Sequence, residues 1–328
     1  MKWGRLALLC AFSMAILFAA PFIGVPRVPF SELFVLPQAD DISVLWDLRV
    51  PRVLLGWVTG ATLAICGMVF QALFRNSLAS PDLLGVSTGA SLGAVIYIRL
   101  GLSFTLFGVL SGLSLAAFLG ALLATFAIYM AGSLPRGGMS EATLLLTGVA
   151  MSFFFSSMNM IIQYSGGYID TFRMMRWSMG GIRAVKFAPV YAPLAALAVI
   201  FVTAIFTAPE LDLFVAGEDI AESRGVSVSK LRRRLFVLVS IVVGVNVAVC
   251  GPIGFVGLMA PHICRRLVGA DHRNLTIASL LFGGAFLVVC DTGARTLWAP
   301  GEVPAGILTS CLGSLFFLWL LFRGRERG

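Results

Sequence analysis

The sequence predicts an all-α, polytopic integral membrane protein with about ten membrane-spanning helices, organised as a single domain over residues 1–328. Apolar residues make up 59% of the chain and charged residues only 12%, whereas a soluble domain carries about 25% charged residues. This shortage of charge extends over the whole length, so we expect no separate soluble domain. Apolar stretches suited to crossing a bilayer cover residues 6–24, 53–74, 83–98, 102–131, 142–162, 187–207, 235–250, 251–264, 275–290 and 303–322.

The first and the eighth stretches need separate treatment. Residues 6–24 follow Lys2 and Arg5, a pattern that a cleaved signal peptide shares. Because the run of nearly 20 residues is long enough to span and no clear A-x-A site precedes Pro21, we favour a retained helix. Residues 251–264 are few and include several glycines and prolines. They are expected to form a broken or partly re-entrant helix, which is tolerated only where protein or water covers the freed backbone.

The distribution of basic residues predicts the topology. With a cytoplasmic N-terminus, most of the 24 Lys and Arg residues fall on the cytoplasmic side, which favours cytoplasmic placement of both termini. The loop 164–186 is the exception, because it carries Arg173, Arg176, Arg183 and Lys186 on the outer side. Either the topology is wrong there or these charges have a function. No basic patch is interleaved with aromatic residues, so the net charge of +8 does not indicate nucleic acid as a partner.

A weak internal repeat supports a transporter-like architecture. Residues 60–67 read GATLAICG and residues 244–251 read GVNVAVCG. The predicted topology sends these two helices in opposite directions, as in the inverted repeats of transporters. Small residues are common in membrane helices, so chance similarity is the alternative.

Several kinds of chemical site find no support in the sequence. None of the three lysines lies in a GxxxxGK[ST] phosphate loop. The six cysteines lie in or beside apolar stretches without a CxxC pair, which favours packed thiols over disulfides or a zinc site. His262 is expected to be structural, near the cytoplasmic surface, and no metal site is predicted.

Four runs carry the specific signal: Leu48–Ala94, Gly217–Arg234, Gly251–Arg273 and Glu302–Leu321. Their most distinctive parts read LRVPR, QALFRNSLASPDLLGVSTGA and GPIGFVGLMAPHICRRLVGADHR. Over nearly the full length, the chain resembles the permease family of ABC importers for iron–siderophore complexes, haem and cobalamin. The resemblance implies an inverted-repeat permease in the inner membrane. It also implies a homodimer, a separate ATPase subunit on the cytoplasmic side and a substrate-binding protein on the outer side.

The LRVPR run places Arg49 and Arg52 on either side of Pro51, a residue suited to the start of a helix. Interfacial snorkelling is the ordinary interpretation of one such arginine. In the family, residues matching Arg49, Arg52 and Arg295 meet carboxylates of the binding protein. The resemblance therefore implies a docking site formed by these three arginines.

The segment from about 208 to 234 is the most hydrophilic interior part of the chain. Ile220 and Val226 lie among its charges, and Gly225 could end a short helix, although an ordinary solvated loop is the alternative. The resemblance implies that this segment seats on the ATPase subunit. Its candidate coupling residues are Gly217, Glu218, Asp219, Ala221, Arg224, Gly225 and Val226.

A translocation pathway is the least specific prediction. Residues at helical spacing in the stretch 142–162 could form one soft face with a single amide, although helix packing explains such a stripe equally well. The candidates for pathway or gate are Glu141, Met151, Phe154, Met158 and Asn159. In related permeases the start of this helix forms a cytoplasmic gate, and the cobalamin member has a pair of hydroxyl residues there. This chain has Glu141–Ala142 at that place, so its sequence departs from the family's gate.

The predicted function is a transport subunit without an ATPase site or a cofactor of its own, with ATP and Mg²⁺ acting on the partner. An iron chelate, siderophore or haem, is the broader expectation for the substrate. Residues 177–181, WSMGG, resemble the cobalamin member slightly more than the hydroxamate-siderophore members, so cobalamin is the alternative substrate. An ion-coupled transporter is the alternative of another class. It would need ionisable groups at mid-membrane, whereas Asp and Glu occur only near the ends of the spans, as at Asp291.

Overall fold

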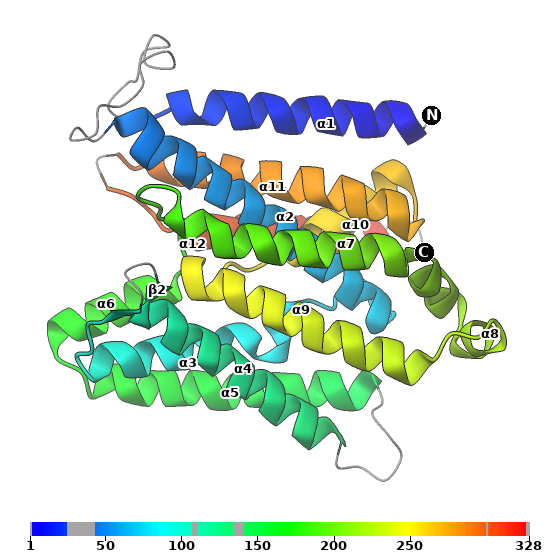
Figure 1. The fold of residues 1–328 in the computed structure, drawn as a ribbon, viewed down its shortest axis with the longest axis horizontal. Helices are drawn as coiled ribbons and strands as arrows, with labels where there is room; N and C mark the ends of the chain where they lie inside the picture. Colours follow the sequence, from blue (N-terminus) through cyan, green and yellow to red (C-terminus); the bar gives the residue numbers. More distant parts are fainter. Residues whose placement is uncertain (1, 25–42, 107–109, 134–140, 300, 326–328) are drawn as a thin grey trace.

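The computed structural model describes residues 2–24, 43–106, 110–133, 141–299 and 301–325 as a bundle of α-helices (Figure 1). In chain order the elements are α1 (Lys2–Ala19), the helical turns η1 (Ala20–Phe22) and η3 (Val44–Arg49), α2 (Val50–Leu73), η4 (Pro81–Leu84), α3 (Val86–Arg99), β1 (Thr105–Leu106), β2 (Leu110–Ser111), α4 (Gly112–Ser133), α5 (Glu141–Tyr164), α6 (Tyr168–Ser178), α7 (Ala188–Ala216), α8 (Glu218–Ser223), α9 (Val228–Cys250), α10 (Val256–Val268), α11 (His272–Thr296) and α12 (Ala305–Arg325).

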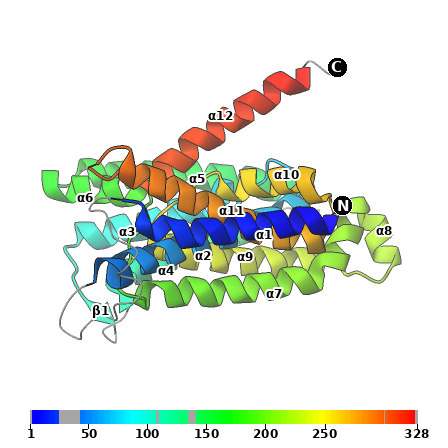
Figure 2. The ribbon, with the colours of Figure 1, turned by 90° about the horizontal axis from the view of Figure 1, so that it is seen from above.

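The long helices lie side by side along the longest axis and give the bundle two ends (Figures 1 and 2). One end, here called the α6 end, holds α6, the β1–β2 hairpin and the start of α2. The opposite end, here called the α8 end, holds α8, the start of α1 and the end of α12. The first helix therefore begins, and the last helix ends, on the same side of the bundle, as the ten predicted crossings require.

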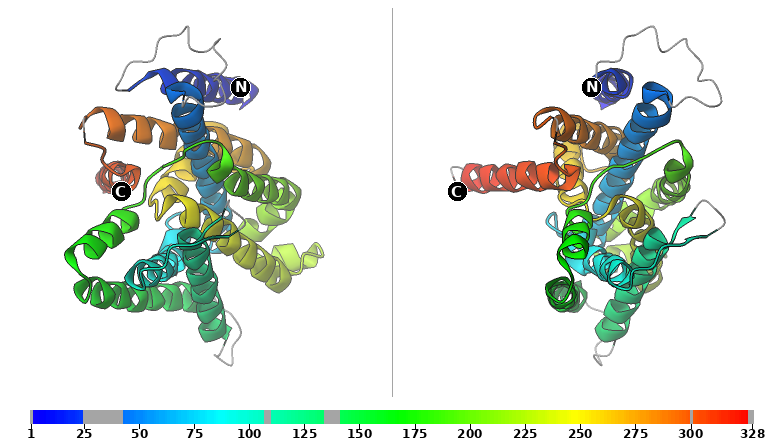
Figure 3. Two further views of the ribbon diagram at one scale, coloured as in Figure 1. Left: turned by 60° about the vertical axis from the view of Figure 1, so that its left-hand side comes forward. Right: turned by 90° about the vertical axis from the view of Figure 1, so that its left-hand side faces the viewer.

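Helix α2 passes through the middle of the bundle (Figure 3), and almost all of its side chains from Val53 onward are buried. Gly60 faces the backbone of Gly283 in α11, and Gly67 faces the backbone of Gly257 in α10. A Cβ atom at Gly60 or Gly67 would overlap the facing chain, so these small residues permit close helix packing. The core around α2 is one large buried cluster that also includes residues of α7, α9 and α11.

Each of the ten predicted stretches contains a helix, and the predicted all-α class is confirmed. Among the described residues, seven helices are long and apolar enough to cross a membrane. Helices α3 and α10 have only 14 and 13 residues, and α12 is apolar over the shorter part Ala305–Leu320. Short helices are tolerated at membrane depth where neighbouring protein satisfies the backbone.

The start of the fourth predicted stretch, 102–131, is wrong. A small antiparallel hairpin pairs Thr105 with Ser111, and α4 begins only at Gly112. The Tyr97 hydroxyl accepts a hydrogen bond of 3.0 Å from the Phe104 amide, which stabilises this turn after α3.

The break predicted within residues 251–264 is present. Helix α9 ends at Cys250, residues 251–255 are not helical, and α10 begins at Val256. Gly251, which follows α9, and Phe255, which precedes α10, both have positive φ, +70° and +66°, so neither residue has α-helical backbone angles.

Helices α2 and α9, which carry the two copies of the weak repeat, run in opposite directions and contact each other (Figure 1). This is the relationship that the predicted topology requires of an inverted repeat.

Candidate functional site

The three arginines that the resemblance assigns to docking lie at the α6 end. Arg49 closes η3, Arg52 lies in the first turn of α2, and Arg295 lies in the last turn of α11. A Cβ atom on Gly24 would lie 3.2 Å from Arg49 Nη2 and 3.2 Å from Arg295 Nη1, so these two guanidinium groups converge at one point. Tertiary packing of α2 against α11 thus brings distant parts of the chain into one cluster.

Two of these arginines are buried, which differs from the open surface position expected from the sequence. Arg49 is 5% exposed and Arg295 is 9% exposed. Arg49 donates a hydrogen bond of 3.0 Å to the Pro21 carbonyl, and Arg295 donates one of 2.7 Å to the Ala20 carbonyl. Carbonyl groups at a helix end lack intrahelical partners and attract cations. Both arginines therefore fix the end of α1 and η1 to the core.

Arg52 is held by two carboxylates. Its Nε and Nη2 atoms lie 2.9 and 3.0 Å from the oxygens of Asp291, and its Nη1 atom lies 3.1 Å from Glu302. Asp291 is 3% exposed, so this ion pair is largely withdrawn from water. The sequence identified Asp291 only as an acid near a helix end. Its position four residues before Arg295 places both on one helix face, which is the signal that could have linked them.

The predicted short helix of the coupling segment is α8, which projects from the bundle at the end opposite α6 (Figure 1). Gly225 has φ +85°. Its amide donates to the Glu222 carbonyl at 2.9 Å, while the Val226 amide donates to the Ala221 carbonyl at 3.0 Å. This pair of bonds is the Schellman arrangement that ends a helix at a glycine. The expectation that Gly225 ends a short helix is therefore met.

Glu218 connects α8 to the bundle. Its carboxylate accepts hydrogen bonds from Arg75 at 3.1 Å and from Arg232 at 2.8 Å. Both guanidinium groups also lie over the ring of Phe214, with Cζ atoms 5.8 and 5.4 Å from its centre. Ala221 is fully buried. One face of α8 is thus bound to the turn after α2, to α7 and to α9.

The other face of α8 is open. Asp219, Glu222, Arg224 and Gly225 are exposed, whereas Gly217 and Val226 are partly buried. The segment outside the long helices is shorter than the predicted 208–234, because α7 continues to Ala216 and α9 begins at Val228. The residues at both ends of the predicted segment are helical and belong to α7 and α9.

Asn159 does not share the face of α5 that carries the apolar pathway candidates. Asn159 is buried and donates a hydrogen bond of 3.3 Å to the Thr88 carbonyl of α3. Phe154 is 53% exposed, and Met151 and Met158 are partly buried. A rotation of about 100° per residue places Met151, Phe154 and Met158 within about 60° of one another and turns Asn159 about 140° from Phe154. Asn159 therefore lies apart from the three apolar candidates, and a pathway along them stays a prediction. Glu141 is the first residue of α5.

His262 packs against the rings of Phe316 and Phe317 of α12. Within the described part of the chain, no three His, Cys, Asp or Glu side chains come close enough to hold a metal ion.

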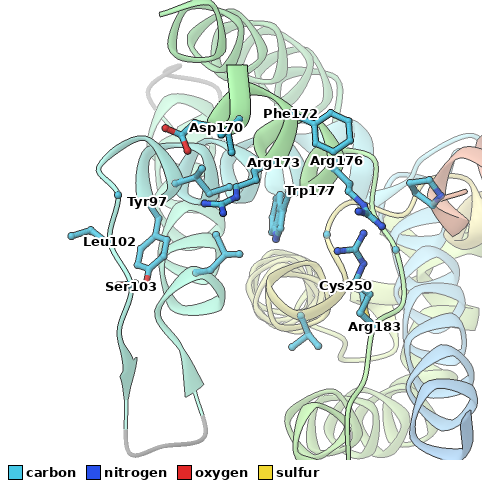
Figure 4. Close-up of a pocket in the computed structure, with 18 of the residues that line it drawn as sticks. Tyr97, Leu102, Ser103, Asp170, Phe172, Arg173, Arg176, Trp177, Arg183 and Cys250 are labelled. Carbon is cyan, nitrogen blue, oxygen red and sulfur yellow. The ribbon is translucent and has the colours of Figure 1, made fainter. Parts of the chain in front are cut away.

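A cavity of about 720 Å³ lies at the α6 end (Figure 4). Its wall includes Tyr97 at the end of α3, Arg173, Arg176 and Trp177 of α6, and Arg183 in the segment that leads to α7. The sequence marked residues 164–186 as unusually basic but predicted neither α6 nor the cavity. The signal for α6 was the spacing of Ile169, Phe172 and Trp177 among polar residues, which suits an amphipathic helix.

Three backbone segments cross next to this cavity. The Gly181 amide donates to the Cys250 carbonyl at 2.7 Å, and the Gly306 amide donates to the Gly180 carbonyl at 3.2 Å. A Cβ atom at Gly180 would overlap the Pro252 carbonyl, so glycine is required for the close crossing. The WSMGG motif thus has a structural role in joining α6 to the break before α10.

Comparison with known proteins accounts for this architecture. Residues 8–323 match the FecCD transport family. The chain is 39% identical over 293 residues to the cobalamin import system permease protein BtuC of Halobacterium salinarum, covering 89% of this chain and 76% of that protein. It is 35% identical over 306 residues to the hemin transport system permease protein HmuU of Yersinia pestis, covering 93% and 91%. It is 32% identical over 291 residues to the iron(3+)-hydroxamate import system permease protein FhuG of Bacillus subtilis, covering 87% and 85%.

A solved structure agrees with the fold. The inward-facing conformation of a transporter assigned to the metal-chelate type of ABC transporters superposes with a TM-score of 0.84 at 27% identity, covering 98% of this chain and 99% of that one. Sequence and fold point to the same family over nearly the entire chain. The chain is a multi-pass membrane permease of ABC importer type and belongs to the FecCD transport family.

Proposed function

We propose that this chain is the membrane subunit of an ATP-driven importer that moves an iron chelate across the inner membrane. It works as a homodimer with a separate ATPase subunit at the α8 end and a substrate-binding protein at the α6 end. The chain binds no cofactor of its own, and ATP and Mg²⁺ act on the ATPase partner.

The single observation that carries this proposal is the geometry of α8. A short polar helix projects from an apolar bundle, and Glu218 binds it to Arg75 of the turn after α2 and to Arg232 of α9. A partner that moves α8 therefore pulls on helices of the core. The exposed residues of α8 and Gly225 form the surface for that partner, while Glu218 and Ala221 transmit its movement.

The charge distribution supports cytoplasmic placement of the α8 end and of both termini. Lys230, Arg232, Arg233 and Arg234 lie in the first turns of α9, beside α8. Clustered basic residues near helix ends favour the cytoplasmic side of a membrane. The α6 end then faces outward.

The arginine cluster at the α6 end supports docking of an acidic binding protein. Arg52 and its partner Glu302 are the more accessible members, with side chains 17% and 48% exposed. Arg49 and Arg295 contribute positive charge from beneath, since both are buried. Electrostatic attraction of this kind raises association rates and makes them sensitive to salt.

Exposed apolar faces on α5 and α12 support the homodimer. Phe153, Phe154 and Met160 are exposed on α5, as are Trp319 and Phe322 on α12, which stands away from the rest of the bundle (Figures 2 and 3). A second copy that covers these faces would place α5, with Met151, Phe154 and Met158, beside the two-fold axis and the pathway. Glu141 would then lie at its cytoplasmic end, and Asn159 would fix α5 to α3.

The substrate proposal rests on the relatives, whose names include haemin, iron(3+)-hydroxamate and cobalamin. An iron chelate is the first candidate. Cobalamin is the second, because a 39% identical relative is named as a cobalamin permease.

Uptake into proteoliposomes tests the proposal. The permease is reconstituted with its ATPase and binding protein, and labelled haem, ferric hydroxamate and cobalamin are offered outside with ATP inside. We expect uptake of an iron chelate that stops when the phosphate-loop lysine of the ATPase is replaced. Uptake driven by a proton or sodium gradient without ATP would contradict the proposal and favour an ion-coupled transporter.

A further inference from the structure

Three arginines in the cavity at the α6 end have no role in the proposed docking or coupling. In the part of the chain that the structure describes, the side chains of Arg173, Arg176 and Arg183 form no hydrogen bond or ion pair. The docking arginines differ, because Arg49, Arg52 and Arg295 all bind carboxylates or backbone carbonyls. The cavity arginines therefore keep their donors available.

The fold places these three cations around one cavity. Arg173 and Arg176 are one helical turn apart on α6, and Figure 4 shows the guanidinium groups of Arg176 and Arg183 directed toward each other. The pKa of Arg183 is lowered by partial burial and then by repulsion from Arg176, which Glu302 partly offsets. The backbone bond from Gly181 to Cys250 holds the segment that carries Arg183. This concentration of like charge is unfavourable without an anion.

The carboxylates nearby do not neutralise the three arginines. Among the described residues, Asp170 is the one acidic residue in the cavity wall, and it forms no ion pair within 4 Å. Glu302 lies on the adjoining side, where it is already bound to Arg52. The cavity thus presents an excess of guanidinium donors, whose planar fork suits carboxylates and other oxyanions.

Aromatic side chains form much of the remaining wall. Tyr97, Tyr168, Phe172 and Trp177 line the same space as the arginines. A volume of about 720 Å³ falls within the range of organic ligand sites, about 300–1,000 Å³. Apolar and aromatic walls with a few convergent charges suit an organic anion with a flat or apolar body.

We propose that this cavity is an outer vestibule in which Arg173, Arg176 and Arg183 bind the carboxylate or other anionic groups of the imported chelate. The inference rests on the proposed import function and specifies its substrate class: an anionic metal chelate with an aromatic or apolar body, rather than a neutral one. Carboxylates of the binding protein are the competing partner. The aromatic side chains that line the cavity beside these arginines favour a small molecule.

Equilibrium binding to the full-length permease in lipid nanodiscs tests the inference without ATP. The probes are haemin, which carries two carboxylates, its dimethyl ester, which has none, and ferric citrate, which is anionic without an aromatic body. The variant is Arg173→Gln/Arg176→Gln/Arg183→Gln. The matched control is Arg99→Gln/Lys186→Gln, which removes exposed cations at the same end that do not line the cavity.

The triple variant should bind haemin at least tenfold more weakly than the wild type, with the ester unchanged and the control like the wild type. The wild type should bind haemin more tightly than ferric citrate, because ferric citrate has no aromatic body to pack against the aromatic wall. Equal binding of haemin and ferric citrate would contradict the part of the inference that concerns the aromatic wall. Unchanged haemin binding by the triple variant would overturn it. So would weakened association of the binding protein without any change in chelate binding, which would assign these arginines to protein docking.

Uptake assays separate this inference from the proposed function. If the wild-type importer moves a neutral chelate with ATP and the triple variant does so equally well, the proposed import function stands. Haemin binding then decides the inference about the arginines, because unchanged binding by the triple variant would contradict it. If the wild type moves no chelate with ATP, the proposed function fails, and the binding measurement still decides whether the cavity is an anion site.

Discussion

Arg52 and Asp291 are 239 positions apart in the sequence, yet their side chains form two hydrogen bonds of 2.9 and 3.0 Å. The pair joins the first turn of α2 to the last turns of α11 at the end of the bundle assigned to the binding protein. It also fixes the guanidinium group beside Glu302, at the surface. Arg52 thus has one buried partner, Asp291, and one exposed partner, Glu302.

Replacing only one member of this pair should destabilise the protein. Arg52→Gln leaves the buried carboxylate of Asp291 with Arg295 as its nearest cation, 4.0 Å away. Loss of one partner of a buried ion pair costs roughly 3–5 kcal/mol, and the nearby Arg295 should keep the cost at the lower end. Thermal unfolding in detergent should show a lower midpoint for Arg52→Gln and partial recovery for Arg52→Gln/Asp291→Asn.

The double variant then isolates docking from stability. It removes the Arg52 charge while keeping the net charge of the permease, so binding-protein association can be compared in a folded background. We expect slower association, a weaker dependence on salt, and rescue of Arg52→Glu by charge reversal at the facing carboxylate of the binding protein. If neither change affects association, Arg52 acts only as a structural anchor.

Gly225 should couple α8 to the ATPase subunit. Its φ of +85° disfavours β-branched side chains, although no atom lies within 4 Å of a Cβ built there. Gly225→Val should therefore disturb the end of α8 through the backbone and not through a clash. We expect normal insertion into the membrane but at least severalfold weaker ATPase association or ATP hydrolysis without uptake.

The control for this prediction is Gly225→Asn, because asparagine adopts the left-handed conformation more readily than valine. It should retain most coupling. Uptake by Gly225→Val at the wild-type rate would contradict the assignment of Gly225 to coupling.

The parts of the fold that follow local pattern could be predicted from the sequence. The ten apolar stretches, the break at Gly251–Phe255 and the helix end at Gly225 are all specified by residues close together in the chain. The hairpin at Thr105–Ser111 was missed because its residues are as apolar as those of the helix that follows. Helix α6 was missed because its charges resemble those of a loop.

Partners distant in the sequence could not be predicted. The resemblance grouped Arg49, Arg52 and Arg295, but it did not indicate that Arg49 and Arg295 would bind carbonyl groups of η1. Glu218 was expected to face a partner, whereas it binds Arg75 and Arg232. Both outcomes depend on how helices pack, and a single sequence carries no direct record of that packing.

Cysteine labelling should confirm the orientation of the two ends. Ser165, before α6, and Ser223, on α8, are both exposed. In a background in which the six native cysteines are replaced, Ser165→Cys should react with an impermeant maleimide added outside intact cells. Ser223→Cys should react only after the inner face is opened. The reverse pattern would invert the topology and with it the assignment of docking and coupling ends.

The stability of the protein should depend on pH through Asp82, in the turn between α2 and α3. Burial raises the pKa of the Asp82 carboxyl from 3.8 to about 6, although hydrogen bonds from Ser87 and Ser80 oppose the shift. In the folded protein this group therefore holds its proton to a higher pH than in the unfolded chain. Its contribution to stability is fully present below about pH 4 and is lost as pH rises through about 6.

The measurement compares the wild type with Asp82→Asn, which resembles the protonated acid in shape. Two pKa units correspond to roughly 3 kcal/mol, so the variant should unfold at a higher temperature than the wild type at pH 7.5, and the difference should shrink toward pH 4.5. Asp219→Asn, on the exposed face of α8, controls for removal of one acidic group. Other carboxylates also titrate in this range, so the wild-type curve alone cannot report on Asp82. The prediction concerns the difference in unfolding temperature between the wild type and Asp82→Asn. An equal difference at both pH values would show that Asp82 is ionised throughout this range, and that Ser80 and Ser87 stabilise the carboxylate more strongly than burial disfavours it.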